Sequence, residues 1–218
     1  MDAPDLNFEV SGAEAPTFAA QPQLLFKLHI TNARPAISIH SVMLRSQIQI
    51  AAPRRRYSLQ EKENLLDVFG EPPRWGETLR PLLWTHANVV APQFSDEITI
   101  DLPVPCTYDF EVVSTRYFDA LEDGEIPLTF LFSGTMFYVG TMGNLQVGQI
   151  SWQKEAAYRL PVATWRAMIQ HYYPNSAWLR LHKDVFEQLV RYKATQGLTT
   201  WDESLTRLLE ATHKKAYL

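Results

Sequence analysis

The sequence predicts an α+β protein that is mainly β: an antiparallel β-sandwich or open barrel with inserted short helices and a C-terminal helical segment. Two observations predict this class. Short stretches of alternating apolar and polar residues, separated by proline, glycine and asparagine, fill residues 6–152. From residue 161 onward the apolar residues recur at helical spacing instead. A chain of 218 residues, 46% hydrophobic and 20% charged, is long enough to bury a core and too apolar to be disordered.

The strands are predicted from period-two alternation, in which one face of the strand is buried. Leu24, Phe26 and Leu28 alternate with Leu25 and Lys27 in the clearest case. The same alternation recurs over residues 42–50, 98–104 and 108–112.

A longer stretch, Ile126–Gln153, has no charged residue. Its glycines and asparagine interrupt the apolar run well before the roughly 20 residues that a membrane-spanning helix needs. We therefore expect a buried hairpin at this place.

Two short helices are predicted inside the β region. Ser58 and Glu61 have the spacing of a capping box, in which each side chain bonds the backbone N–H of the other residue. This box begins a helix over Leu59–Phe69 that ends at Gly70. A second short helix is expected over Ser114–Leu121.

The C-terminal part reads as three helices. Val162–Tyr172 is the first, and Ser176 is expected to cap a longer second helix that Gly197 closes. Thr200 and Glu203 form another capping box at the start of the third. The apolar residues of the last two helices are expected to face the core; they are Trp178, Leu181, Val185, Phe186, Leu189, Val190, Tyr192, Trp201, Leu205, Leu208 and Leu209.

The change of period and of charge predicts two parts. Residues 1–158 are predicted to form the β-sandwich domain, with inserted helices near 59–69 and 114–121. Residues 159–218 are predicted to form a helical segment packed on the sandwich. Lys and Arg outnumber Asp and Glu only after about residue 161.

Catalytic and metal-binding patterns are weak. A single cysteine excludes a disulfide framework, and no two histidines have the three- or four-residue spacing of metal ligands on one helix face. We therefore predict no metal, no cofactor and no enzymatic activity. An enzyme using Cys106 as nucleophile and His86 as base is the weakest alternative, because lone cysteines are mostly buried structural thiols.

A basic triplet, Arg54, Arg55 and Arg56, follows a predicted strand and precedes the first capped helix. Guanidinium groups at this place suit an anion or an acidic partner surface. The alternative interpretation is that charged residues protect a sheet edge from pairing with other chains. A net charge of −4 and the lack of a further basic stripe argue against nucleic acid as the partner.

The segment Phe69–Gly76 is rigid, aromatic and cationic, because it contains two prolines followed by Arg74 and Trp75. Tryptophan and arginine are enriched at the energetic centres of protein interfaces, so this segment suits a docking surface. The alternative places Trp75 in the protein's own core. The predicted binding residues are Arg54, Arg55, Arg56, Arg74, Trp75 and Trp84.

Neither a signal peptide nor a membrane span is predicted, so a soluble cytoplasmic protein without membrane insertion is expected. A non-catalytic module that docks another protein is the leading hypothesis for function. The alternative is a sandwich that binds a small molecule or a sugar in a cleft lined by Trp75, Trp84, Trp152 and Trp178.

Five longer motifs stand out, at residues 54–58, 69–76, 79–86, 103–111 and 172–181. Together they resemble a bacterial family of unknown function whose members are often encoded beside nickel–iron hydrogenase genes. The resemblance covers nearly the whole chain and implies an accessory role, with a hydrogenase subunit as the partner. Because the chain has no cysteine or histidine cluster, the resemblance favours a chaperone-like or scaffold role over metal insertion.

Overall fold

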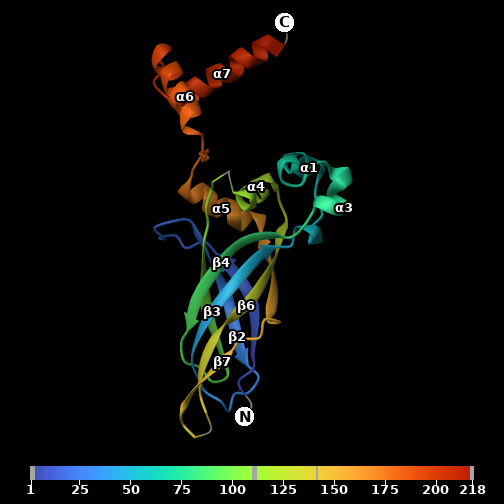
Figure 1. Cartoon of the computed structure of the whole chain (residues 1–218), viewed down its shortest axis with the longest axis vertical. Coiled ribbons are helices and arrows are strands. Elements are labelled where there is room, and N and C mark those ends of the chain that lie inside the picture. Colours follow the sequence, from blue (N-terminus) through green and yellow to red (C-terminus); the bar gives the residue numbers. More distant parts are fainter. Residues whose placement is uncertain (1–2, 110–111, 141, 217–218) are drawn as a thin grey trace. The chain divides into compact units, whose positions relative to one another are not determined.

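The computed structural model describes residues 3–109, 112–140 and 142–216, with only the backbone for 213–216. The chain forms two compact units, Met1–Trp178 and Leu179–Leu218. The first unit contains all the strands (Figure 1).

One sheet of the first unit has three antiparallel strands in the order β1-β2-β5. They are β1 (Leu6–Glu14), β2 (Gln23–Asn32) and β5 (Glu97–Pro105). The register shift in β1 between Val10 and Gly12 marks a β-bulge. The alternation in residues 24–31 thus belongs to the central strand of this sheet.

The second sheet has the order β4-β3-β6, and β6 then pairs with two further strands. Because β6 is 15 residues long, its second half pairs with β7 and its first half with β8, all antiparallel. The expected hairpin is therefore present as β6 and β7, but the prediction that it is buried holds only for β6, because β7 has no buried residue. The strands are β3 (Ile39–Ile50), β4 (Leu82–Ala91), β6 (Glu125–Val139), β7 (Leu145–Gln149) and β8 (Glu155–Pro161).

The core lies between the two sheets. Phe8 of β1 stacks on Phe132 of β6 with ring centroids 4.5 Å apart, and Phe26 of β2 meets Phe130 edge-on at 5.1 Å. The sheets are not closed into a barrel. The predicted fold class, a mainly antiparallel β protein with added helices, is confirmed.

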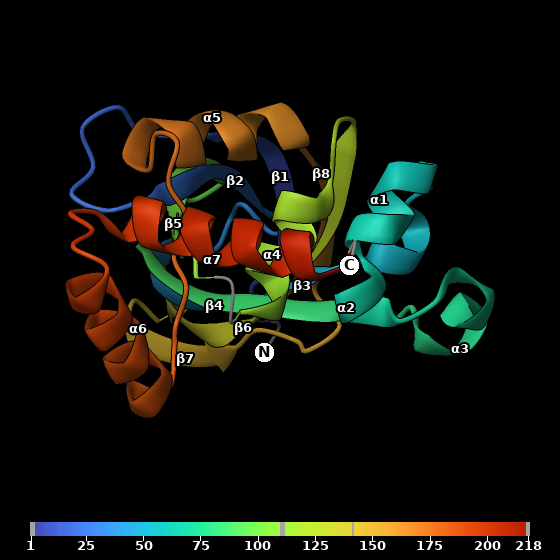
Figure 2. The same ribbon diagram turned by 90° about the horizontal axis from the view of Figure 1, so that it is seen from above.

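Helices α1–α5 gather at one end of the sandwich (Figures 1 and 2). The helix predicted over residues 59–69 is interrupted at Leu65 and forms α1 (Leu59–Asn64) and α2 (Leu66–Phe69). It ends as expected at Gly70, whose φ of 72° is a conformation that suits glycine.

Two further predicted helices are confirmed as α4 (Val113–Ala120) and α5 (Val162–Tyr172). The one-turn helix α3 (Trp75–Thr78) was not predicted from the sequence. Helix α5 buries Trp165 and Met168 in the sandwich core, which makes it part of the first unit. The two units thus divide at Trp178, whereas the sequence predicts a boundary at residue 158, and the predicted packing of the last segment on the sandwich stays a prediction.

The second unit consists of α6 (Lys183–Thr195) and α7 (Trp201–Ala216). The prediction that Ser176 caps α6 is wrong, because α6 begins at Lys183. Trp178 forms a parallel β-bridge with Asp109 instead, and this long-range contact holds the backbone extended where a helix was expected. Gly197 (φ 63°) follows the end of α6 as predicted.

The capping box that begins α7 is confirmed. The Thr200 backbone N–H donates to the Glu203 carboxylate at 3.2 Å, and the Glu203 N–H donates to Thr200 Oγ1 at 3.1 Å. No helix in the described part of the chain combines the length and the apolar character needed to cross a membrane.

Candidate functional site

The predicted basic site divides into one buried and two exposed arginines. The Arg55 side chain is 9% exposed and forms an ion pair with Glu61, whose side chain is 3% exposed. It also donates to the carbonyl oxygens of Asp123 at 2.9 Å and Glu125 at 3.0 Å. Arg55 therefore joins the segment before α1 to the start of β6: its two terminal nitrogens have partners within the protein, and its buried Nε has none among the described residues.

Glu61 completes this buried network. Its carboxylate accepts hydrogen bonds from the backbone N–H groups of Ser58 and Glu122, both at 3.0 Å, and the Ser58–Glu61 capping box is confirmed. Burial raises the pKa of Glu61, but these N–H donors and Arg55 outweigh burial and hold the pKa below its usual value. Glu61 is therefore a carboxylate at neutral pH.

Arg54, Arg56 and Arg74 are exposed. Arg74 ends the 3-10 turn Pro72–Arg74, just before α3. These three guanidinium groups are the part of the predicted binding set that solvent and partners reach.

Trp75 packs against its own protein. Its indole N–H donates to the Gly70 carbonyl oxygen at 2.9 Å, and its ring meets Tyr57 edge-on at 5.3 Å and Phe69 at 5.9 Å. Trp84 likewise lies edge-on to Phe118 at 4.9 Å. These contacts favour the alternative that the sequence left open for Trp75, a structural role.

The four tryptophans proposed to line a cleft occupy different environments. Trp75 lies beside Phe69, and Trp84 contacts Trp165 in the core. Trp152 is 82% exposed between β7 and β8, and Trp178 is exposed next to Tyr173. The pockets beside Tyr108, Met43 and Pro4 are lined by none of these four rings.

Cys106 is a buried thiol at the end of β5, and its Sγ donates to the Val104 carbonyl oxygen at 3.3 Å. Burial raises the pKa of Cys106 to about 12, so the nucleophilic thiolate is disfavoured at neutral pH. His86, its suggested base, is exposed on β4.

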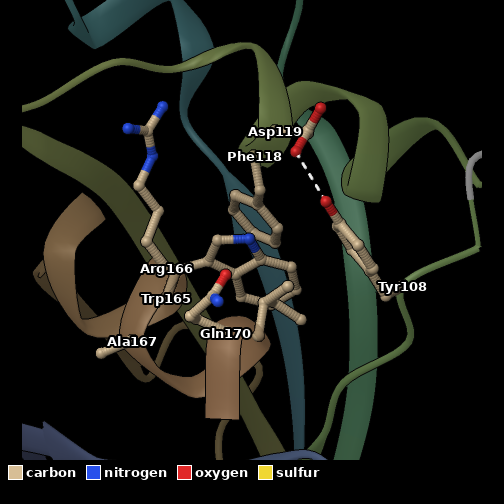
Figure 3. A pocket seen from close by; sticks show the side chains of 8 residues that line it. Tyr108, Phe118, Asp119, Trp165, Arg166, Ala167 and Gln170 are labelled. Atoms are coloured by element: carbon tan, nitrogen blue, oxygen red, sulfur yellow. Dashed lines mark hydrogen bonds between the residues drawn. The ribbon is translucent and has the colours of Figure 1, made fainter. Parts of the chain in front are cut away.

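A pocket of about 380 Å³ opens between α4 and α5 (Figure 3). Trp165 and Phe118 form its apolar wall, with ring centroids 4.3 Å apart. Tyr108 donates to Asp119 at 3.0 Å on one side of the pocket, whereas the Arg166 guanidinium points away from this pair. Burial, then the Asp119 carboxylate, raises the pKa of Tyr108 to about 12. The sequence analysis missed this pocket, because its lining comes from three separate segments.

The second unit leaves much of its apolar surface exposed. Every residue of α6 is described and none is buried, although the sequence led us to expect that its apolar stripe faces the core. Leu189 of α6 and Leu208 of α7 are half-buried. Five exposed side chains at four-residue spacing form what we call the helical apolar face: Phe186, Val190, Trp201, Leu205 and Leu209.

Among the described residues, no group of three or more histidine, cysteine, aspartate or glutamate side chains is placed to hold a metal ion. No curated protein and no solved structure matches the chain. The family model DUF6084, described as a family of unknown function, matches residues 3–217, and the chain therefore belongs to this family.

Proposed function

We propose that the protein is a non-catalytic accessory protein, scaffold-like or chaperone-like, that acts by binding other protein chains. The observation that supports this most is the helical apolar face. The Phe186 ring of α6 and the Trp201 ring of α7 lie with their centroids 5.4 Å apart, which joins the apolar residues of the two helices. The described side chains of this unit include no buried apolar core. Exposed apolar surface of this kind is typical of a protein-binding site.

Arg54, Arg56 and Arg74 are proposed as a second contact, for an acidic partner surface. Their exposure supports this role, and the two prolines before Arg74 limit the conformational entropy that docking would remove. Arg55, Trp75 and Trp84 are left out of this contact, because each is engaged inside the protein.

The experiment is affinity capture of the tagged full chain from its native cells, followed by mass spectrometry. We expect Leu205→Asp to lose the captured proteins, since a carboxylate at a desolvated interface is costly. Trp152→Ala is the matched control, because it removes an exposed apolar side chain outside the helical apolar face. Equal capture by wild type and Leu205→Asp would contradict the proposal.

A hydrogenase subunit is the partner that we propose to test first, and its support is the resemblance of the sequence motifs alone. Binding of the purified full chain to a purified hydrogenase large or small subunit tests it directly. A failure would reject this partner and leave the proposed mode of action in place.

A second candidate function is the binding of a small molecule in the pocket between α4 and α5. Its volume lies within the range of ligand pockets, and Asp119 provides a hydrogen-bond acceptor beside an apolar wall. A metabolite panel screened by thermal shift tests this function. A ligand of the pocket should stabilise the wild type and lose its effect in Asp119→Asn.

A further inference from the structure

The second unit is too small to be stable by its own core. It spans Leu179–Leu218, and of its described side chains only Ser204 is buried, with its hydroxyl donating to the Thr200 carbonyl oxygen at 2.8 Å. Folded units of about 40 residues usually need disulfides, a metal or oligomerisation. The chain's single cysteine, Cys106, lies outside this unit, and no metal-binding group occurs among its described residues. Packing on the first unit stays a prediction, and oligomerisation is the other means by which this unit could bury its apolar side chains.

We infer that the helical apolar face is covered by the same face of a second copy of this chain, so that two helical pairs form one shared core. This inference rests on the proposed function and names the occupant of that face in the free protein, which another protein would have to displace. In such a two-fold arrangement the same surface is used on both copies. The helices of a bundle bury their apolar stripes against one another in this way.

The exposed area is sufficient for a dimer. From their exposed fractions, the five side chains present on the order of 500 Å² of apolar surface per copy. Two copies would remove on the order of 1,000 Å² before polar atoms at the rim are counted, which reaches the area of a specific interface.

The charges of the two helices also permit self-association. Together α6 and α7 carry six Lys and Arg residues and five Asp and Glu residues, so two identical pairs have almost no net repulsion. Both signs are present on each helix, so the charges of two copies include opposite as well as like pairs.

Sedimentation equilibrium of the purified full chain tests the inference over concentrations on the order of 1 to 100 µM. We expect a dimer for the wild type and a monomer for Leu209→Asp, because Leu209 is 63% exposed on the helical apolar face. Leu145→Asp is the matched control: Leu145 is 57% exposed on β7, an edge strand, and pairing of such an edge is a competing route to a dimer.

Helix melting, followed by circular dichroism at 222 nm, guards against a variant that simply unfolds. A dimeric wild type should melt at a temperature that rises with protein concentration. This measurement uses the wild type alone, so an unfolded variant cannot affect it. A wild-type chain that stays monomeric overturns the inference. So does a dimer that Leu145→Asp dissociates and Leu209→Asp does not.

The inference and the proposed function can fail separately. If the wild type is monomeric but Leu205→Asp still loses proteins captured from cells, another protein occupies the face, and the second copy is rejected alone. If the chain is dimeric but captures no other protein, the dimer stands and the accessory function is rejected.

Discussion

Replacing Glu61 with glutamine tests whether the buried Arg55–Glu61 pair stabilises the first unit. Glu61→Gln keeps the shape of the side chain and one acceptor oxygen, but it removes the negative charge that pairs with Arg55 and turns an NH2 donor toward a backbone N–H. Arg55 keeps its two carbonyl acceptors. Breaking a buried ion pair by removing one partner costs about 3–5 kcal/mol. Because Arg55 keeps those two acceptors, we expect the lower end of that range, about 3 kcal/mol.

The pair also predicts a dependence on pH. The pKa of Glu61 is lowered in the folded state, so its stabilising effect is fully present above the pKa of the unfolded chain. The effect is lost as the pH falls through the lower, folded-state pKa. The stability difference between wild type and Glu61→Gln should therefore be largest near neutral pH and shrink in acid.

Urea unfolding measures both the cost of the substitution and its dependence on pH. It is followed by near-ultraviolet circular dichroism, which reports on the buried aromatic side chains of the first unit. A cycle with Arg55→Met and the double variant should give a coupling energy of about 1–3 kcal/mol at neutral pH. The reasoning is refuted if Glu61→Gln costs less than about 1 kcal/mol, or if its cost is the same at neutral and acidic pH.

Three further substitutions, with Trp152→Ala as a control, test other contacts of the first unit. Trp75→Ala should lower the free energy of unfolding in urea by about 2–3 kcal/mol, less than the loss of a fully buried tryptophan. Trp152→Ala should change it by less than about 0.5 kcal/mol. Equal small losses in both variants would favour Trp75 as a docking residue again. Cys106→Ser should lower the free energy of unfolding by about 1–3 kcal/mol and leave partner capture unchanged. Thiol reagents should modify Cys106 of the wild type only slowly until urea is added. Rapid labelling of the folded protein would contradict the burial of this thiol. Tyr108→Phe should lower stability by about 1 kcal/mol through the lost hydrogen bond to Asp119, and no change would show that this bond contributes nothing.

Local signals in the sequence were sufficient for much of the fold. The capping box at Thr200 and Glu203 is a contact between residues three apart, and Gly70 ends its helix through its own backbone freedom. Period-two alternation identified β2 because a strand buried on one face repeats its pattern within a few residues. Such features depend on neighbours in the chain, so the sequence shows them directly.

Contacts between distant segments were not predictable in this way. Ser176 has the chemistry of a helix cap, but the bridge between Trp178 and Asp109 determines the local backbone. Arg55 looked like one of three equivalent arginines, and only the fold brings the carbonyl oxygens of Asp123 and Glu125 to it.

The helical apolar face is another feature that the sequence predicts only in part. The apolar stripes of α6 and α7 were visible as a pattern, which predicts that a surface is covered but not what covers it. The pocket at Asp119 was missed entirely, because Tyr108, α4 and α5 meet only in the folded chain.

Hydrogen exchange of the α6 and α7 backbone amides in the full chain tests the central claim most directly, namely that another protein chain covers the helical apolar face. The account predicts fast exchange in these helices at high dilution, and slow exchange at high concentration or with the captured proteins added. Amides of β3, in the centre of its sheet, should be protected equally in every condition. Slow exchange of α6 and α7 that is unchanged by dilution of a monomeric chain would contradict the account.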